Sequence, residues 1–285
     1  MTVTTTRELL ADAVGHRKAV LAVNVITLEH AEAIAAAAER CDAAVIMQLS
    51  ENAIRYHRGR LLPIATAMFE TADAARVPVA LHLDHVTDPE LVTAALEPAT
   101  VRLFSSMMYD AGALPHAQNL SCTRDVAARA HEHGYLVEAE LGYVGGKPHA
   151  PASAHAAGVR TDPDEAVEFV TRTGVDALAV AVGSSHAMTE RTARLDVDLI
   201  NALRARVPVP LVLHGSSGVA ADDLRSAVSA GIAKINVGTA VNVRMTAAIR
   251  ATLGADGQAV DPRGYLTDAR DAMTHSVTDL LAAVR

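Results

Sequence analysis

The sequence contains no tryptophan, three phenylalanines and two cysteines among 285 residues, and its formal net charge is −8. Two cysteines without a CxxC spacing suit a reducing cytoplasm, and we expect neither to be reactive. The lack of a basic cluster argues against nucleic acid as a partner, because a phosphate backbone requires concentrated Lys and Arg. No signal peptide and no run of about 18 uncharged apolar residues is present, so we expect a soluble, cytoplasmic protein without a membrane partner.

What the sequence does contain is a repeat of short β-branched runs and longer amphipathic segments. The expected strands cover residues 19–26, 43–50, 77–85, 100–107, 135–141, 177–183, 209–215 and 232–238. The expected helices cover residues 28–40, 62–76, 89–96, 117–133, 163–173, 196–206, 221–230 and 240–253. Strands that are apolar on both faces and separated by helices require a parallel sheet covered by helices.

Eight such units indicate an α/β fold of the closed (β/α)₈ TIM barrel type. We expect one barrel domain over residues 1–285, with a C-terminal helical extension at about 261–285. The first strand is not followed by a Gly-x-Gly-x-x-Gly turn, which argues against a dinucleotide-binding sheet.

Titratable side chains occur where the expected strands end, which is where such barrels carry out their chemistry. They are Asp84, His85, Asp110, Glu138, Glu140, His186 and His214. One histidine at a strand end is usually structural, but three at one barrel mouth form the donor set of a catalytic zinc ion with one open position. Nearby carboxylates can act as bases or hold a second cation. The pattern therefore predicts a metal centre.

Two other polar residues lie inside expected strands. His82 is on the same side of its strand as Asp84 but one pleat deeper, which favours a supporting role. Lys234 is the only lysine in an expected strand, and we interpret it as half of a structural ion pair. The histidines away from the mouth, expected at the surface, are His16, His30, His57, His116, His131, His133 and His275.

Small residues follow the last two expected strands. Gly215 to Gly218 precede one helix, and Asn236 to Thr239 precede the next. Small side chains let backbone N–H groups approach an anion at a helix N-terminus, and these two loops commonly bind phosphate in such barrels. Together they predict a phosphate cradle beside the metal.

These motifs resemble the class II, zinc-dependent ketose-bisphosphate aldolases of the fructose- or tagatose-bisphosphate type. The resemblance runs from "AVNVITLE" through "LHLDH", "FSSMMYD", "VEAELGYVGG", "LHGSSG" and "KINVGT" to "DPRGYL". It implies a lyase that reversibly cleaves a phosphorylated ketose to dihydroxyacetone phosphate and an aldehyde, assembled as a homodimer or homotetramer. A zinc ion chelated by the C2 carbonyl and C3 hydroxyl would stabilise the enediolate, so no Schiff-base lysine is required.

The resemblance also implies roles for individual residues. His85, His186 and His214 would bind Zn²⁺, and Asp84 would handle the proton of the C4 hydroxyl. Asp110 and Glu140 would line a secondary metal position. The positions that would bind the substrate or its phosphates, with Na⁺ or K⁺ nearby, are Asn24, Ser50, Gly183, Gly215, Ser217, Asn236, Gly238 and Thr239.

The sequence departs from the family pattern at several positions. The glutamate expected soon after the Gly-Gly of the fifth loop is missing where Pro148 stands, so His149 or His155 is the candidate base for the proton at C3. Ala187 and Glu190 replace a glycine and a lysine that usually follow the sixth strand. Two alternatives follow: a catalytically impaired or re-specialised metal-binding relative, and a zinc hydrolase on the same barrel, although the first strand lacks the usual His-x-His.

Overall fold

The computed structural model describes residues 2–142, 144 and 160–284. Within them, eight parallel strands form a closed barrel in which each strand pairs with the next and the last pairs with the first. The strands are β1 (Val20–Asn24), β2 (Val45–Ser50), β3 (Val79–Val86), β4 (Ser106–Tyr109), β5 (Leu136–Leu141), β6 (Ala177–Val180), β7 (Leu211–Leu213) and β8 (Ile232–Val237). The predicted (β/α)₈ barrel is confirmed.

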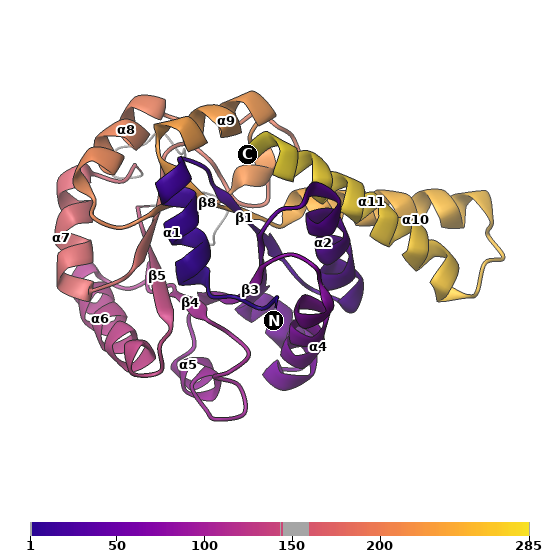
Figure 1. The fold of residues 1–285 in the computed structure, drawn as a ribbon, viewed down its shortest axis with the longest axis horizontal. Coiled ribbons are helices and arrows are strands. Elements are labelled where there is room, and N and C mark those ends of the chain that lie inside the picture. Colours follow the sequence, from indigo (N-terminus) through magenta and orange to yellow (C-terminus); the bar gives the residue numbers. More distant parts are fainter. Residues whose placement is uncertain (1, 143, 145–159, 285) are drawn as a thin grey trace.

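The helices lie around the barrel, across one of its ends or beyond it (Figure 1). They are α1 (Thr6–His16), α2 (Leu28–Cys41), α3 (Glu51–Tyr56), α4 (Leu61–Ala74), α5 (Pro89–Ala95), α6 (His116–Glu132), α7 (Pro163–Thr173), α8 (Val197–Arg206), α9 (Ala221–Ala230), α10 (Thr239–Ala255) and α11 (Pro262–Val284), with a 3₁₀ turn at Ser216–Gly218. The eight predicted helices match within two residues, whereas α1 and α3 were not predicted.

The fourth predicted strand is misplaced. It was expected at residues 100–107, but β4 begins at Ser106. The preceding segment turns instead, since the Thr100 N–H donates to the Glu97 carbonyl at 2.9 Å and the Leu103 N–H donates to the Thr100 carbonyl at 2.9 Å. The β-branched pair at 100–101 therefore lies in a turn, where local hydrogen bonds override strand propensity.

Helix α1 closes the N-terminal end of the barrel. Its start is set by a capping box, in which Thr5 Oγ1 accepts from the Glu8 N–H at 3.2 Å and the Glu8 carboxylate accepts from the Thr5 N–H at 3.0 Å. Leu9 and Leu10 are buried against small residues inside the barrel such as Ala22. Figure 1 shows the helix lying across the barrel opening.

The barrel interior changes from apolar to polar along its axis. Strand residues alternate between the interior and the helix layer, and the parallel register aligns interior positions of neighbouring strands. Near the N-terminal end Ile46 pairs with Ala80, and one pleat higher Gln48 pairs with His82. The expectation of strands apolar on both faces is therefore correct only for the lower part of the barrel, and the upper interior carries the polar groups.

The C-terminal extension is the helix α11, as predicted. It packs against α2, α9 and α10, and Figure 1 shows α10 and α11 running side by side beyond the barrel. Across the described ranges, none of the helices combines the length and the hydropathy needed to span a bilayer.

His30 is a correction to the predicted surface histidines. It is 1% exposed, and its Nε2 lies 3.0 Å from Oδ1 of Asn242, which joins α2 to α10. The covering by α10 and α11 buries it, and burial lowers its pKa. His57 is half-buried with its Nε2 2.7 Å from the Ile26 carbonyl oxygen. The other five are exposed as predicted: His16, His116, His131, His133 and His275.

Candidate metal centre and active site

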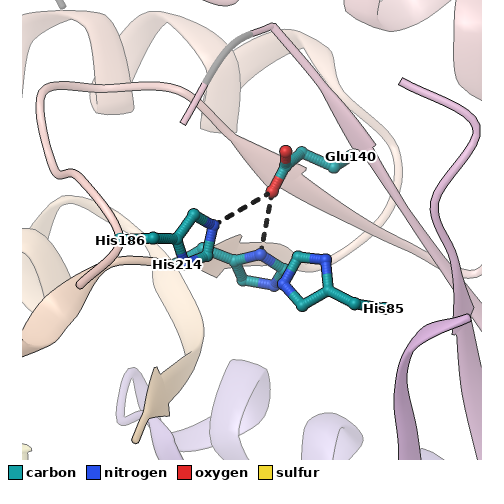
Figure 2. Close-up of side chains that lie close together, drawn as sticks. All are labelled: His85, Glu140, His186 and His214. Carbon is teal, nitrogen blue, oxygen red and sulfur yellow. Dashed lines mark hydrogen bonds and ion pairs between the residues drawn. The ribbon is translucent and has the colours of Figure 1, made fainter. Parts of the chain in front are cut away.

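Three histidines converge at the C-terminal mouth of the barrel. His85 is near the end of β3, His186 is in the segment after β6, and His214 directly follows β7. Their ring centroids lie 5.0–5.7 Å apart. Together with Glu140 of β5 they offer ligand atoms that all lie within 4.8 Å of one another (Figure 2). The sequence placed these residues at one mouth, and the structure brings them to one point.

The donor atoms of this cluster fit a divalent cation. His85 Nδ1 lies 2.9 Å from Asp110 Oδ2, which leaves its other nitrogen for a ligand. Within the part of the chain that the structure describes, His186 Nε2 is buried without a hydrogen-bond partner, because its contact with Glu140 Oε2 is 3.9 Å long. A buried polar atom without a partner is costly unless something binds it. Three imidazoles and a carboxylate around such an atom are the ligand types that zinc prefers.

Protonation differs sharply between two of the histidines. Burial is the main cause that lowers the pKa of His186, so its imidazole is neutral at pH 7. Burial also acts to lower the pKa of His214, but its hydrogen bonds with Glu138 and Glu140 outweigh this and raise the pKa to about 9. Without metal, His214 therefore holds a proton that a cation must displace.

A fully buried ion pair lies beneath the cluster. Lys234 Nζ is 2.6 Å from Glu138 Oε2, and both side chains have zero exposure. Burial acts to raise the pKa of Glu138, but the ammonium of Lys234 and the hydrogen bond with His214 hold it well below the usual range. The ion pair expected of Lys234 is thus present, and its partner is Glu138.

His82 occupies a supporting position one pleat below Asp84, as predicted. Its Nδ1 lies 2.8 Å from Ser106 Oγ, and its Nε2 lies 3.4 Å from Lys234 Nζ. Burial and the charge of Lys234 lower its pKa to about 3, so the ring is neutral. It packs below the cluster and does not belong to it.

Asp84 lies at the mouth next to the histidines and is 2% exposed. Asn24 Nδ2 is 3.2 Å from one carboxylate oxygen and Asn236 Nδ2 is 3.4 Å from the other. Burial acts to raise the pKa of Asp84, but its electrostatic interactions with the neighbouring His85 and His214 outweigh this and the net shift of the pKa is downward. Asp84 is therefore an ionised carboxylate held in place by two amides, which can accept a proton.

The predicted phosphate loops pack tightly against their neighbours. Gly183 has φ 121°, and a Cβ there would lie 2.2 Å from the Arg194 carbonyl oxygen. Gly215 has φ 67°, and a Cβ there would lie 2.6 Å from the backbone of Ser185. Only glycine fits such positions without strain. The loops after β6 and β7 are therefore in direct contact.

Other predicted ligand-binding residues link these loops to helix starts. Ser217 Oγ accepts from the Ala240 N–H at 3.0 Å, which ties the loop after β7 to the first turn of α10. Gly238 and Thr239 form the start of that helix. Ser50 caps α3, where its Oγ accepts from the Ala53 N–H at 3.2 Å.

The departures from the family pattern have different outcomes. Ala187 has φ 59°, so it adopts the left-handed conformation that a glycine takes without strain. Glu190 is exposed. The candidate bases His149 and His155 lie outside the described residues.

Sequence reasoning missed Glu51 and Ser184. Glu51 is buried at the start of α3 and accepts from the N–H groups of Thr87 and Asp88 at 2.6 and 3.1 Å, which anchors the chain just after His85. Ser184 is 2% exposed, and its hydroxyl has no hydrogen-bond partner among the described residues. No periodic pattern singles out either residue. The available signal was position, since Glu51 directly follows β2 and Ser184 directly follows the strand expected at 177–183.

Comparisons with known proteins agree with this architecture. A family model described as fructose-bisphosphate aldolase class-II matches residues 4–285. A curated fructose-bisphosphate aldolase of Geobacillus stearothermophilus is 36% identical over 279 residues, which cover 97% of this chain and 95% of that protein. One of Staphylococcus aureus (strain Mu50 / ATCC 700699) is 36% identical over 273 residues, which cover 95% of this chain and 93% of that protein.

Solved structures give the same result. The YdjI aldolase from Escherichia coli K12 is 29% identical with a TM-score of 0.81, covering 99% of this chain and 97% of that chain. A chain from Coccidioides immitis is 30% identical with a TM-score of 0.86, covering 98% of this chain and 95% of that chain. Similarity over nearly the full length, in sequence and in backbone, carries more weight than any single motif. The chain belongs to the class-II fructose-bisphosphate aldolase family, a family of aldehyde-lyases.

Proposed function

We propose that this protein is a metal-dependent aldolase that reversibly cleaves a phosphorylated ketose of the fructose- or tagatose-bisphosphate type. The products would be dihydroxyacetone phosphate and an aldehyde. The observation that carries the proposal is the cluster of His85, His186, His214 and Glu140 at the same mouth as the ionised Asp84. The names of the curated relatives support fructose bisphosphate as the substrate.

The three histidines would hold the metal, which we propose to be Zn²⁺. When bound, a zinc ion supplies Lewis-acid stabilisation of the negative charge that develops on substrate oxygens. Asp110 orients His85 through its 2.9 Å contact with Nδ1. The secondary metal position beside Asp110 and Glu140, and a Na⁺ or K⁺ ion near the phosphate, stay predictions.

Asp84 would carry out the proton transfer at the C4 hydroxyl. In cleavage it removes that proton, the O–H electrons form the aldehyde carbonyl, and the C3–C4 bonding electrons remain on C3. In condensation the same carboxylic acid returns the proton to the C4 oxygen. Asn24 and Asn236 keep the carboxylate oriented through their amides. The second proton transfer, at C3, stays a prediction for His149.

The phosphate groups of the substrate would bind at the loops after β6, β7 and β8. The residues proposed to bind the substrate and its phosphates are Asn24, Ser50, Gly183, Gly215, Ser217, Asn236, Gly238 and Thr239. The start of α10 at Gly238 and Thr239, to which the loop after β7 is tied through Ser217 and the Ala240 N–H, supports an anion site at this helix N-terminus. We also propose that the protein assembles as a homodimer or homotetramer and is cytoplasmic. Sedimentation of the purified protein measures its assembly state.

The experiment that tests this function combines metal analysis with a retro-aldol assay. Purified protein is expected to contain stoichiometric zinc and to release triose phosphate from at least one member of a panel of ketose mono- and bisphosphates. A chelator should abolish the release, and added zinc should restore it. Zinc without cleavage of any substrate would indicate the impaired or re-specialised relative, and phosphate release without C–C cleavage would indicate a hydrolase. Absence of bound metal would contradict the proposal.

A further inference from the structure

A continuous chain of buried polar groups runs through the barrel from helix α1 to the metal centre. Each member lies within 3.4 Å of the next, and the order is Thr6, Ser106, His82, Lys234, Glu138 and His214. A barrel interior is ordinarily filled by apolar side chains. Taking the charges of Lys234 and Glu138 out of water is costly, and their mutual attraction offsets this cost only when the geometry is good. The place of this pair directly below a metal-ligand candidate points to a role in that site.

The two ring nitrogens of His214 face different carboxylates. Nδ1 lies 2.9 Å from Glu140 Oε2, and that same oxygen is 3.9 Å from His186 Nε2, so Nδ1 faces the cluster (Figure 2). Nε2 lies 2.9 Å from Glu138 Oε1, which belongs to the ion pair below. The ring therefore stands between the metal centre and the buried ion pair.

The charge on Glu138 determines which nitrogen of a neutral His214 carries the hydrogen. Lys234 Nζ lies 2.6 Å from Glu138 Oε2 and keeps the carboxylate ionised, so its other oxygen can only accept a hydrogen bond. Nδ1 faces Glu140 and Nε2 faces Glu138, each at 2.9 Å, so a lone pair on either nitrogen would be repelled by a carboxylate. A cation held beside Glu140 would take the lone pair of Nδ1, and Nε2 would then carry the hydrogen that Glu138 accepts. Asn236 Nδ2 lies 3.0 Å from Nε2 and 3.4 Å from Asp84 Oδ1, so this neutral amide competes with Glu138 for Nε2. The charge-assisted hydrogen bond with the Glu138 carboxylate is the stronger of the two.

We propose that Glu138, held by Lys234, is a positioning residue that fixes His214 as its Nε2–H tautomer and presents the Nδ1 lone pair to the metal. The inference rests on the proposed metal centre and deepens it. A ligand that is held in the binding tautomer and orientation loses less freedom when the metal binds. His82 and Ser106 extend the support by packing against Lys234 on the side away from the metal.

The first test determines the tautomer in the native protein. With zinc-loaded protein labelled with ¹⁵N in histidine, long-range ¹H–¹⁵N correlation spectra separate protonated from metal-bound ring nitrogens. The expected result is a histidine bound through Nδ1 with a proton on Nε2. Coordination of all three histidines through Nε2 would overturn the proposal without any variant.

The second test measures zinc affinity by competition with a chromophoric chelator, and the site geometry by the visible absorption of the Co²⁺ form. Glu138→Gln and Lys234→Met are each expected to weaken zinc binding by about 10–100-fold, the usual effect of losing an outer partner of a ligating histidine. Both should also change the Co²⁺ spectrum. Glu168→Gln and Lys18→Met, which make the same changes at exposed positions, should leave both unchanged.

A double variant separates positioning from structural support. Glu138→Leu combined with Lys234→Met replaces the ion pair with apolar side chains, which is often neutral or stabilising for the fold. It is expected to unfold at a temperature no lower than the metal-free wild type but to bind zinc about 10–100-fold more weakly. Wild-type affinity and an unchanged Co²⁺ spectrum in this variant would overturn the proposal. Failure of the wild type to bind zinc would instead overturn the proposed function.

Discussion

At the scale of single residues, His214 couples the metal centre to pH. Its pKa of about 9 in the metal-free protein lies above the ordinary 6.5, because two carboxylates outweigh the effect of burial. The protonated ring therefore stabilises the metal-free fold fully below pH 6.5, and this contribution is lost as the pH rises through 9. Metal binding must displace the same proton, so the two effects have opposite pH dependences.

We accordingly expect zinc affinity to rise about tenfold per pH unit between pH 7 and 9, with release of a proton on binding. Competition against a chelator of known proton affinity at pH 7, 8 and 9 measures this slope. Proton uptake or release in a weakly buffered solution is an independent check. An affinity that is flat over this range, after correction for the chelator, would contradict the raised pKa of His214.

The roles of Asp84 and His214 should separate on substitution. Asp84→Asn preserves the shape of a residue outside the histidine cluster, so zinc content should remain and turnover should fall by about 10²–10⁴-fold, the usual range for a general base. His214→Ala removes a ligand and should lose both zinc and turnover. Metal analysis and retro-aldol kinetics on the two variants measure the outcome. Loss of zinc from Asp84→Asn would refute the assigned role.

Gly183 should be intolerant of a side chain for two reasons that can be separated. It has φ 121°, and an added Cβ would lie 2.2 Å from the Arg194 carbonyl oxygen and 2.7 Å from the Arg160 guanidinium. Gly183→Ala should therefore lower the free energy of unfolding by more than about 1 kcal/mol and impair substrate binding. Gly134 is the matched control: it has φ 79°, and among the described residues no atom lies within 4 Å of an added Cβ. Gly134→Ala therefore measures the cost of the backbone conformation alone. Equal denaturation midpoints for the two variants would show that the contact does not matter.

At the scale of elements, His30 joins two helices that are far apart in sequence. Its Nε2 contacts the side-chain oxygen of Asn242 at 3.0 Å, linking α2 to α10. Burial lowers the pKa of His30, and in the neutral ring Nδ1 accepts from the Thr27 N–H at 3.3 Å, so Nε2 donates to Asn242. The link helps to place the start of α10, which carries the predicted phosphate-binding residue Thr239.

A double-mutant cycle with His30→Ala and Asn242→Ala should give a coupling energy of about 1 kcal/mol in urea denaturation, the net value of a typical hydrogen bond. His16→Ala, at an exposed position, is the matched control and should change stability by less than about 0.5 kcal/mol. Additive single-variant effects would indicate that His30 contributes packing only.

At the scale of the whole molecule, the proposed metal joins separate parts of the barrel. Its ligands come from β3, from the segment after β6, and from the end of β7, with Glu140 on β5. A ligand that binds only the folded state raises the free energy of unfolding by about 2.7 kcal/mol when its free concentration is 100 times its dissociation constant. Bound zinc therefore connects strands that only the closed barrel brings together.

Removing zinc with a chelator should lower the unfolding temperature, and restoring free zinc should reverse the change. A stabilisation of about 2.7 kcal/mol corresponds to a shift of roughly 4–5 °C for a chain of this size. Differential scanning calorimetry measures the shift, and His214→Ala serves as the control that should show none. An identical unfolding temperature with and without zinc would mean that zinc does not bind the folded state preferentially.

Much of this organisation was predictable from local patterns. The alternation of strand and helix predicts the barrel, and strand-end residues such as His85 and His214 predict the mouth, because parallel strands in a barrel end on the same side. The turn at Thr100 was mispredicted because local propensity there resembles a strand. Helix α1 precedes the repeat, and its capping box at Thr5 and Glu8 was the signal that could have revealed it.

The sequence by itself determined the order of the strands, the helices between them and the chemical identity of the groups at their ends. Only the tertiary structure decided that Glu140 joins the histidine cluster while Glu138 pairs with Lys234 below it. Both glutamates face the barrel interior two residues apart on β5, so alternation cannot distinguish them. Glu138 meets Lys234 of β8, whereas Glu140 meets histidines on β3, after β6 and after β7. Closure of the barrel sets the height at which these groups meet β5. Barrel closure also gives His214 two carboxylate neighbours, Glu138 and Glu140, which the sequence pattern of its own strand could not predict.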